Sequence, residues 1–243
     1  GEDDYVEKVT LSFPLGATYN TVKAPLDPQA GNRVSLGVEP GISFGDGEAS
    51  YTRITSSAST YRKISDRLVA AVRAEAGTFL GDEGVPVDRK FFAGGGGSVR
   101  GFEYQSLSPT DSDGNIIGGD AMFAASLELR WRKSERWGYV AFVDSGYAAD
   151  SIDEAFGEMR TSFGLGVRFY PGFGPVRFDI ATPLDRRDGE DPVQIYAGHD
   201  PQTEMVDGHP VGTHCAGRLA HCCTPLDCLR RRAGFRGVSD RWP

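Results

Sequence analysis

Apolar and polar side chains alternate along several short segments of the chain, most sharply in AMFAASLELRWR at residues 121–132. Leu127, Leu129 and Trp131 occupy every second position there, and Glu128 and Arg130 occupy the positions between them. A period of two places alternate side chains on opposite faces of a β-strand. The segment is therefore predicted to be a strand with one apolar face and one charged face.

The same alternation recurs along most of the chain and predicts about nine strands, which is within the usual range for a sheet. RLVAAVRAEAGTFL could by itself also form a helix, but its neighbours favour a strand. DSIDEAFGEMR, residues 150–160, is expected to be a polar loop. The expected strands occupy residues 7–19, 32–44, 50–64, 67–80, 121–132, 138–149 and 192–198, with a hairpin at 161–184 around the turn PGFGP.

The alternation fits two kinds of protein. In a membrane barrel with a wet lumen the apolar face points outward to lipid, whereas in a soluble β-sandwich it points inward. Trp131, Trp137 and Tyr139 cluster around the turn RKSERWG, as aromatic residues do at a membrane boundary. Ordinary packing of aromatic residues in a hairpin would give the same cluster.

The composition narrows the class of protein. The chain has 243 residues with 32 glycines, and no apolar run reaches the ~20 residues that a spanning helix needs. Any crossing of a membrane must therefore use strands. The net charge of −8 argues against nucleic acid as a partner. Because Gly1 is followed by no secretory signal, the chain is expected to begin inside a longer precursor or to be a fragment.

A glycine-rich segment, FFAGGGGSVRGFEYQ at residues 91–105, interrupts the pattern of strands. The run Gly94 to Gly97 permits positive φ angles and close backbone approach. Arg100 follows it among aromatic residues that include Phe92, Phe102 and Tyr104. The segment is predicted to be a loop that folds back and inserts its tip into an acidic, aromatic-lined interior.

The loop and several strands resemble an outer-membrane family. SVRGF resembles the VRGF/Y loop signature of the outer-membrane assembly-factor superfamily, the BamA and TamA proteins, and the form VDRKFFAGGGGSVRGF looks closest to the TamA branch. The resemblance covers residues 5 to about 198. Its other segments, in the family order, are LDPQAGNRVSL (26–36), SLELRW (126–131), FVDSG (142–146) and FGLGVRFYPGFGPVRFDIATPL (163–184).

The resemblance implies an all-β fold, a transmembrane antiparallel β-barrel. Residues 1–198 would form its C-terminal part, about nine of 16 strands, with a long inserted loop that packs in the lumen. The loop motif is Val99, Arg100, Gly101 and Phe102. The resemblance also implies that Arg100 pairs inside the barrel with Glu128 and Asp144, an arrangement that charge-assisted bonds to a guanidinium would stabilise.

The function that the resemblance implies is assembly of other proteins in the bacterial outer membrane. Such a factor inserts or translocates autotransporters and other β-barrel proteins, through a weak seam between its first and last strands. Its partners would be outer-membrane lipid, unfolded substrate proteins and a TamB-like protein of the inner membrane. The alternatives are a transport pore of the same superfamily, including the two-partner-secretion type, and a soluble β-sandwich that binds a ligand.

No catalytic constellation is visible in the sequence. SVRGF has no nucleophile with a base beside it, and GGGGS is not followed by the Lys-Ser/Thr of a P-loop. We therefore expect neither enzymatic turnover nor a cofactor.

The last segment, residues 199–243, breaks abruptly with this pattern. It holds every histidine and cysteine of the chain, six arginines and no lysine. Its Cys and His residues could bind a metal, but their spacing matches no known zinc module, so no metal site is expected. A frameshifted or foreign, disordered tail is the preferred interpretation. The possible ligands would be His214, Cys215, His221, Cys222, Cys223 and Cys228.

Overall fold

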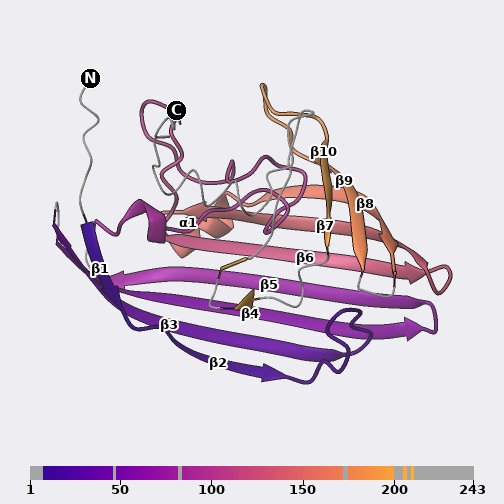
Figure 1. The fold of residues 1–243 in the computed structure, drawn as a ribbon. Helices are drawn as coiled ribbons and strands as arrows, with labels where there is room; N and C mark the ends of the chain where they lie inside the picture. Colours follow the sequence, from indigo (N-terminus) through magenta and orange to yellow (C-terminus); the bar gives the residue numbers. More distant parts are fainter. Residues whose placement is uncertain are drawn as a thin grey trace, which may run out of the picture.

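The computed structural model describes residues 8–45, 48–81, 84–171, 175–199, 205–206 and 209–210. One antiparallel sheet dominates it, in the order β1-β3-β4-β5-β6-β7-β8-β9-β10, with β2 also paired to β3 (Figure 1). The strands are β1 (Lys8–Ser12), β2 (Leu15–Asn20), β3 (Gly31–Gly45), β4 (Ala49–Ser65), β5 (Leu68–Gly81), β6 (Ala121–Arg132), β7 (Trp137–Ala149), β8 (Arg160–Phe169), β9 (Val176–Pro183) and β10 (Gln194–His199). A separate pair joins β11 (Met205–Val206) to β12 (His209–Pro210).

The expected all-β antiparallel fold is confirmed, and residues 67–80 are strand rather than helix. Two expectations were wrong in detail. The polar loop expected at residues 150–160 contains a short helix, α1 (Ile152–Gly157), because the Ser151 hydroxyl caps it by accepting a hydrogen bond from the backbone N–H of Glu154. The other concerns the first strand.

The single strand expected at residues 7–19 is split into β1 and β2. Both halves pair with β3 in one continuous register, since Ser12 lies opposite Gly41 and Leu15 lies opposite Val38. Pro14 falls between them and has no backbone N–H to donate to the ladder. β1 and β2 therefore form one interrupted edge, and the sheet has the nine strand positions that the sequence predicts.

The two faces of the sheet differ as the alternation predicts. On β6 the side chains of Leu127, Leu129 and Trp131 are each nearly half exposed, whereas Glu128 is buried. The apolar face is thus the outer face, and the charged face lines the inside. In the described part of the chain, no helix has the length and apolar character needed to cross a membrane.

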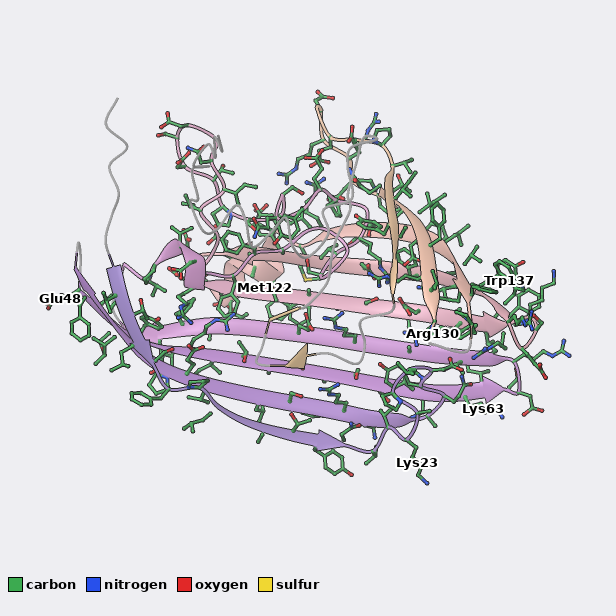
Figure 2. All side chains as sticks on the ribbon, in the orientation of Figure 1. Lys23, Glu48, Lys63, Met122, Arg130 and Trp137 are labelled. Carbon is green, nitrogen blue, oxygen red and sulfur yellow. The ribbon has the colours of Figure 1, made fainter. Side chains whose placement is uncertain are left out.

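The connections differ at the two ends of the strands. β4 and β5 are joined by a tight turn, and β6 and β7 by another at which Trp137 lies (Figure 2). At the opposite end β5 and β6 are joined by the longest connection, residues 82–120, which includes the short 3₁₀ helix η1 (Val87–Arg89) and passes across β6 and β7 (Figure 1). Outer-membrane barrels have short turns on the periplasmic side and long loops outside. In the barrel that the resemblance implies, the long loop would therefore be on the extracellular side.

The tail prediction for residues 199–243 falls almost wholly outside the described residues. The same holds for all of its possible metal ligands. Within the described ranges, no group of three or more His, Cys, Asp or Glu side chains could hold a metal ion.

The orientation of the sheet predicts different effects of a new charge on its two faces. Leu127→Arg places a cation against lipid near the middle of β6 and is expected to cost about 2–4 kcal/mol of unfolding free energy. Ser57→Arg places the same group on the inner face, at the cavity beside the ion pair of Glu75 with Arg73, and should cost much less. Urea unfolding in lipid vesicles measures both variants. Equal destabilisation would contradict the assignment of the faces.

Candidate functional site

The tip of the loop at residues 94–107 is a set of tight turns packed against the inner face of the sheet. Gly94, Gly95 and Gly101 adopt positive φ angles, which side chains disfavour. Val99 and Phe102 are buried on either side of Arg100. They form a small apolar core with Ala93, Leu107, Ala124 and Ala148. The apolar flanks of the motif thus fix the loop on β6 and β7 and leave Arg100 directed at the strands.

Asp144 of β7 holds Arg100 from both its side chain and its backbone. The guanidinium donates to the two carboxylate oxygens through Nε at 2.6 Å and Nη2 at 2.9 Å. The backbone N–H of Arg100 donates to Oδ2 of the same carboxylate at 3.1 Å. Such a two-pronged pair fixes orientation as well as charge. Both side chains are almost fully buried.

Two further carboxylates complete the surroundings of the guanidinium. Nη2 lies 2.8 Å from Oε1 of Glu128 on β6, and Nη1 lies 3.3 Å from Oδ2 of Asp179 on β9. Each of these carboxylates has a second arginine: Arg130 Nη2 lies 2.7 Å from Glu128 Oε2, and Arg168 Nη2 donates to Asp179 at 3.2 Å. We call these three arginines and three carboxylates the luminal ion network. Its formal charges cancel, so no member is left as an uncompensated buried ion.

Uncharged groups make the remaining contacts of the motif, including the hydrogen bonds of its backbone. The Phe142 ring lies under the guanidinium, with 3.5 Å between the Arg100 Cζ and the ring centroid. The Ser162 hydroxyl donates to the backbone carbonyl of Arg100. The Tyr196 hydroxyl of β10 accepts from the backbone N–H of Gly101 at 2.9 Å and donates to the carbonyl of Phe102 at 3.0 Å. These groups and Asp144 bond the motif to three strands, β7, β8 and β10, and Asp179 and Glu128 add β9 and β6.

The structure brings together all of the residues that the sequence singled out. Arg100 contacts both Glu128 and Asp144, and Val99, Gly101 and Phe102 hold it in place. Sequence reasoning missed other members of the site, namely Arg130, Phe142, Ser162, Arg168, Asp179 and Tyr196. The alternation places Arg130, Ser162, Arg168 and Asp179 at positions that face the lumen of a barrel, and this was the available signal for these four. No pattern indicated Phe142 or Tyr196.

A second contact fastens the start of the loop to the other half of the sheet. The Phe91 ring occupies the space above Gly77 of β5, where a Cβ atom would lie 2.2 Å from the ring. Phe79 packs beside it with 5.1 Å between the ring centroids, and the Arg53 guanidinium lies 4.6 Å from the Phe91 centroid. Arg89 adds an ion pair of 3.1 Å with Glu39 of β3. We call this contact the Phe91 socket.

A third contact ties the loop between β9 and β10 to the tip of the motif. Arg160, at the start of β8, pairs with Asp185 at 2.6 Å and with Glu190 at 2.8 Å. Its guanidinium also lies 5.0 Å from the centroid of the Phe102 ring. The hydrogen bond from Arg160 favours the ionised form of Glu190 and lowers the pKa of that carboxyl group. Two extracellular connections are thereby held together at this end of the strands.

A cavity of about 130 Å³ remains beside the luminal ion network. Its walls include the loop residues Gly96 to Ser98, the inner faces of β4 and β5, and Pro25 and Pro28 of the connection between β2 and β3. The loop therefore partly fills the space inside the sheet. It does not pack solidly against β3 and β4.

Comparison with known proteins gives the family. Residues 2–199 match the Omp85 superfamily domain. The chain belongs to the Omp85 superfamily. As a member of this superfamily it is an outer-membrane protein of bacteria with a transmembrane β-barrel fold, and the sheet described above is an open part of such a barrel. The predictions of fold, superfamily and location are thus confirmed.

Two relatives show how much of such a protein the chain represents. The chain is 36% identical over 138 residues to the "Outer membrane protein assembly factor BamA" of Nitratidesulfovibrio vulgaris, an alignment that covers 54% of this chain and 17% of that protein. The crystal structure of BamA from Haemophilus ducreyi lacking POTRA domains 1-3 is similar with a TM-score of 0.62 and 22% identity, over 76% of this chain and 41% of that one. Both relatives carry the name BamA, so closeness to the TamA branch stays a prediction.

The luminal ion network predicts a strong effect of removing its central cation. Arg100→Ala would leave the Asp144 carboxylate buried without its arginine, at a cost of about 3 kcal/mol. We expect a lower urea midpoint and rapid proteolysis within residues 82–120. Arg187→Ala is the control, because its partner Glu158 is 3.9 Å away and both are exposed. An unchanged midpoint with a protease-resistant loop in Arg100→Ala would show that the network does not hold the loop.

The Phe91 socket predicts a defect that is local to the start of the loop. Gly77→Ala would place a methyl group where the Phe91 ring lies, so the ring must leave the inner face of β5. Proteolysis is expected to increase near residues 84–91, while the segment around Arg100 stays protected. Gly198→Ala is a matched control, since no atom lies within 4 Å of its added Cβ. Mass spectrometry of the fragments locates the cleavage sites. Protection throughout the loop of Gly77→Ala would argue against a separate anchor at Phe91.

Proposed function

We propose that this chain is the C-terminal barrel portion of an outer-membrane assembly factor that inserts β-barrel proteins into the outer membrane. The observation that carries the proposal is the VRGF loop bound to the inner face by the luminal ion network, in a chain of the Omp85 superfamily. The similarity to proteins named as assembly factors supports it. The chain spans 17% of the length of the curated relative that it matches, so the activity belongs to the complete protein.

The proposed mechanism needs no cofactor and no enzymatic turnover. Among the described residues, the far edges of β1, β2 and β10 have no neighbouring strand in the main sheet. A free edge offers backbone N–H and C=O groups to an incoming strand. We propose that β10, as the last strand of the barrel, borders the seam at which a substrate strand pairs. Substrates would be unfolded outer-membrane proteins, and lipid would surround the outer face.

The finer part of the proposal concerns the clients. Autotransporters would be among the substrates, with a TamB-like protein spanning the periplasm as partner, if the loop form VDRKFFAGGGGSVRGF marks the TamA branch as its resemblance suggests. A general insertase would instead accelerate the folding of many different barrel proteins to a similar extent. The two differ in which unfolded proteins they accelerate.

Reconstitution of the complete gene product in lipid vesicles tests this function. An unfolded autotransporter barrel and an unfolded porin are added separately, and the folded fraction is followed by the shift in gel mobility between boiled and unboiled samples. We expect faster folding than in empty vesicles, and a lower rate with Arg100→Ala than with Arg187→Ala. Acceleration of the autotransporter alone would favour a TamA-type role.

Two outcomes would count against the proposal. A protein that inserts and conducts ions but accelerates neither client is a pore, which is the alternative within the same superfamily. A protein that stays in solution without detergent, and whose gel mobility does not change on boiling, does not act as a membrane barrel.

A further inference from the structure

The helix α1 lies on the outer face of the barrel and not over its lumen. It contacts β6 and β7, and the ring of Phe156 packs against Phe123 of β6 with 4.4 Å between the centroids. Phe123 alternates with the inward residues of β6, which include Glu128, and shares the parity of Leu127 and Leu129. The side of β6 that α1 covers is therefore the apolar, outer side.

Phe156 and Glu154 lie on different sides of the helix, because two residues correspond to a rotation of about 200°, whereas Asp153, three residues before Phe156, borders the side of Phe156. Ala155 is fully buried against the strands, whereas Phe156 is 51% exposed despite its contact with Phe123. Asp153 and Glu154 are exposed in the first turn. A single exposed Phe on a soluble protein would need no explanation. Here the exposed ring extends the apolar outer face of the sheet beside Phe123, near the start of β6.

The position along the strand places this ring at the boundary of the membrane. Phe123 lies eight residues before Trp131 in β6, which is about 27 Å along a strand that rises ~3.4 Å per residue. With a tilt of about 40°, the separation along the membrane normal is roughly 20 Å, close to the ~25 Å apolar band of outer-membrane barrels. Trp131 and Tyr139 stack at the periplasmic end. Phe123 and Phe156 therefore lie near the opposite boundary.

We propose that α1 is an interfacial membrane anchor: Phe156 enters the lipid of the outer leaflet at the boundary between acyl chains and headgroups, while Glu154, on another side of the helix, stays in water. Barrels have aromatic girdles at both boundaries, and here an extracellular loop supplies part of the outer one. The occupant is lipid because the surface is continuous with the lipid-facing side of β6. The inference rests on membrane insertion, which the proposed function also requires.

Photocrosslinking in cells tests the anchor directly. A benzophenone amino acid replaces Phe156 in the complete gene product, and the products of irradiation are identified by mass spectrometry. Leu129, on the outer face of β6, is the site of the positive control, and Tyr104, exposed on the luminal loop, is the site of the negative control. We expect lipid adducts at position 156 to be similar in yield to those at position 129 and several times more abundant than those at position 104.

The outcomes separate the anchor from the proposed function. Lipid adducts at position 129 with none at position 156 would overturn the anchor and leave the barrel in place. Protein adducts alone at position 156 would overturn it in favour of a protein partner on this face. Absence of lipid adducts at both positions would overturn membrane insertion and the anchor together.

A second measurement avoids the bulky crosslinker. Phe156→Trp adds an indole whose fluorescence should be quenched by lipids brominated near the headgroup, after subtraction of the parent signal from its native tryptophans. Tyr104→Trp should escape this quenching. Equal quenching of the two added indoles, or none at position 156, would contradict insertion of Phe156 into lipid.

Discussion

The buried positive charge of Arg100 is the constraint on which the loop and the inner face of the sheet depend. A guanidinium removed from water is costly unless charged and polar groups surround it. Here the carboxylates come from β6, β7 and β9. They meet only when these strands are in register and the loop tip is seated. The protein can therefore bury Arg100 only when the loop is bound to the sheet. This holds whether or not the network makes the protein more stable than apolar side chains at the same positions would.

The loop is held at two separated places, and the chemistry of the two differs. Around Arg100 the contacts are ionic and directional, so they fix the orientation of the tip. At the Phe91 socket the main contact is an aromatic ring over a glycine, which depends on shape and burial. β5 provides the socket, and β6 to β10 hold the tip. The loop thus spans the curved sheet from its middle toward its last strand, and it resists a change in curvature between the two halves.

Strand alternation determined much of the fold in advance, since a period of two fixes which side chains face lipid once one face is known. Together with the barrel that the resemblance implies, it placed Leu127 outward and Glu128 inward without any contact being visible. The pairing of Arg100 with Glu128 and Asp144 came from the resemblance of the motif. Asp179 escaped notice because its role depends on the register of β9 against β8, where it lies opposite Gly166. Pro14 was a signal in the sequence for the split between β1 and β2. The helix α1 is too short to produce a periodic pattern.

Tyr196 connects this locked interior to the edge of the sheet. β10 pairs with β9 over only six residues, and its outer edge has no strand beside it in the part of the chain that the structure describes. The Tyr196 hydroxyl nevertheless bonds to both Gly101 and Phe102, on either side of the peptide that follows Arg100. Separating β10 from β9 would therefore break these bonds or draw the loop tip away from Asp144. The edge strand β10 is in this way restrained from inside the barrel by the loop motif.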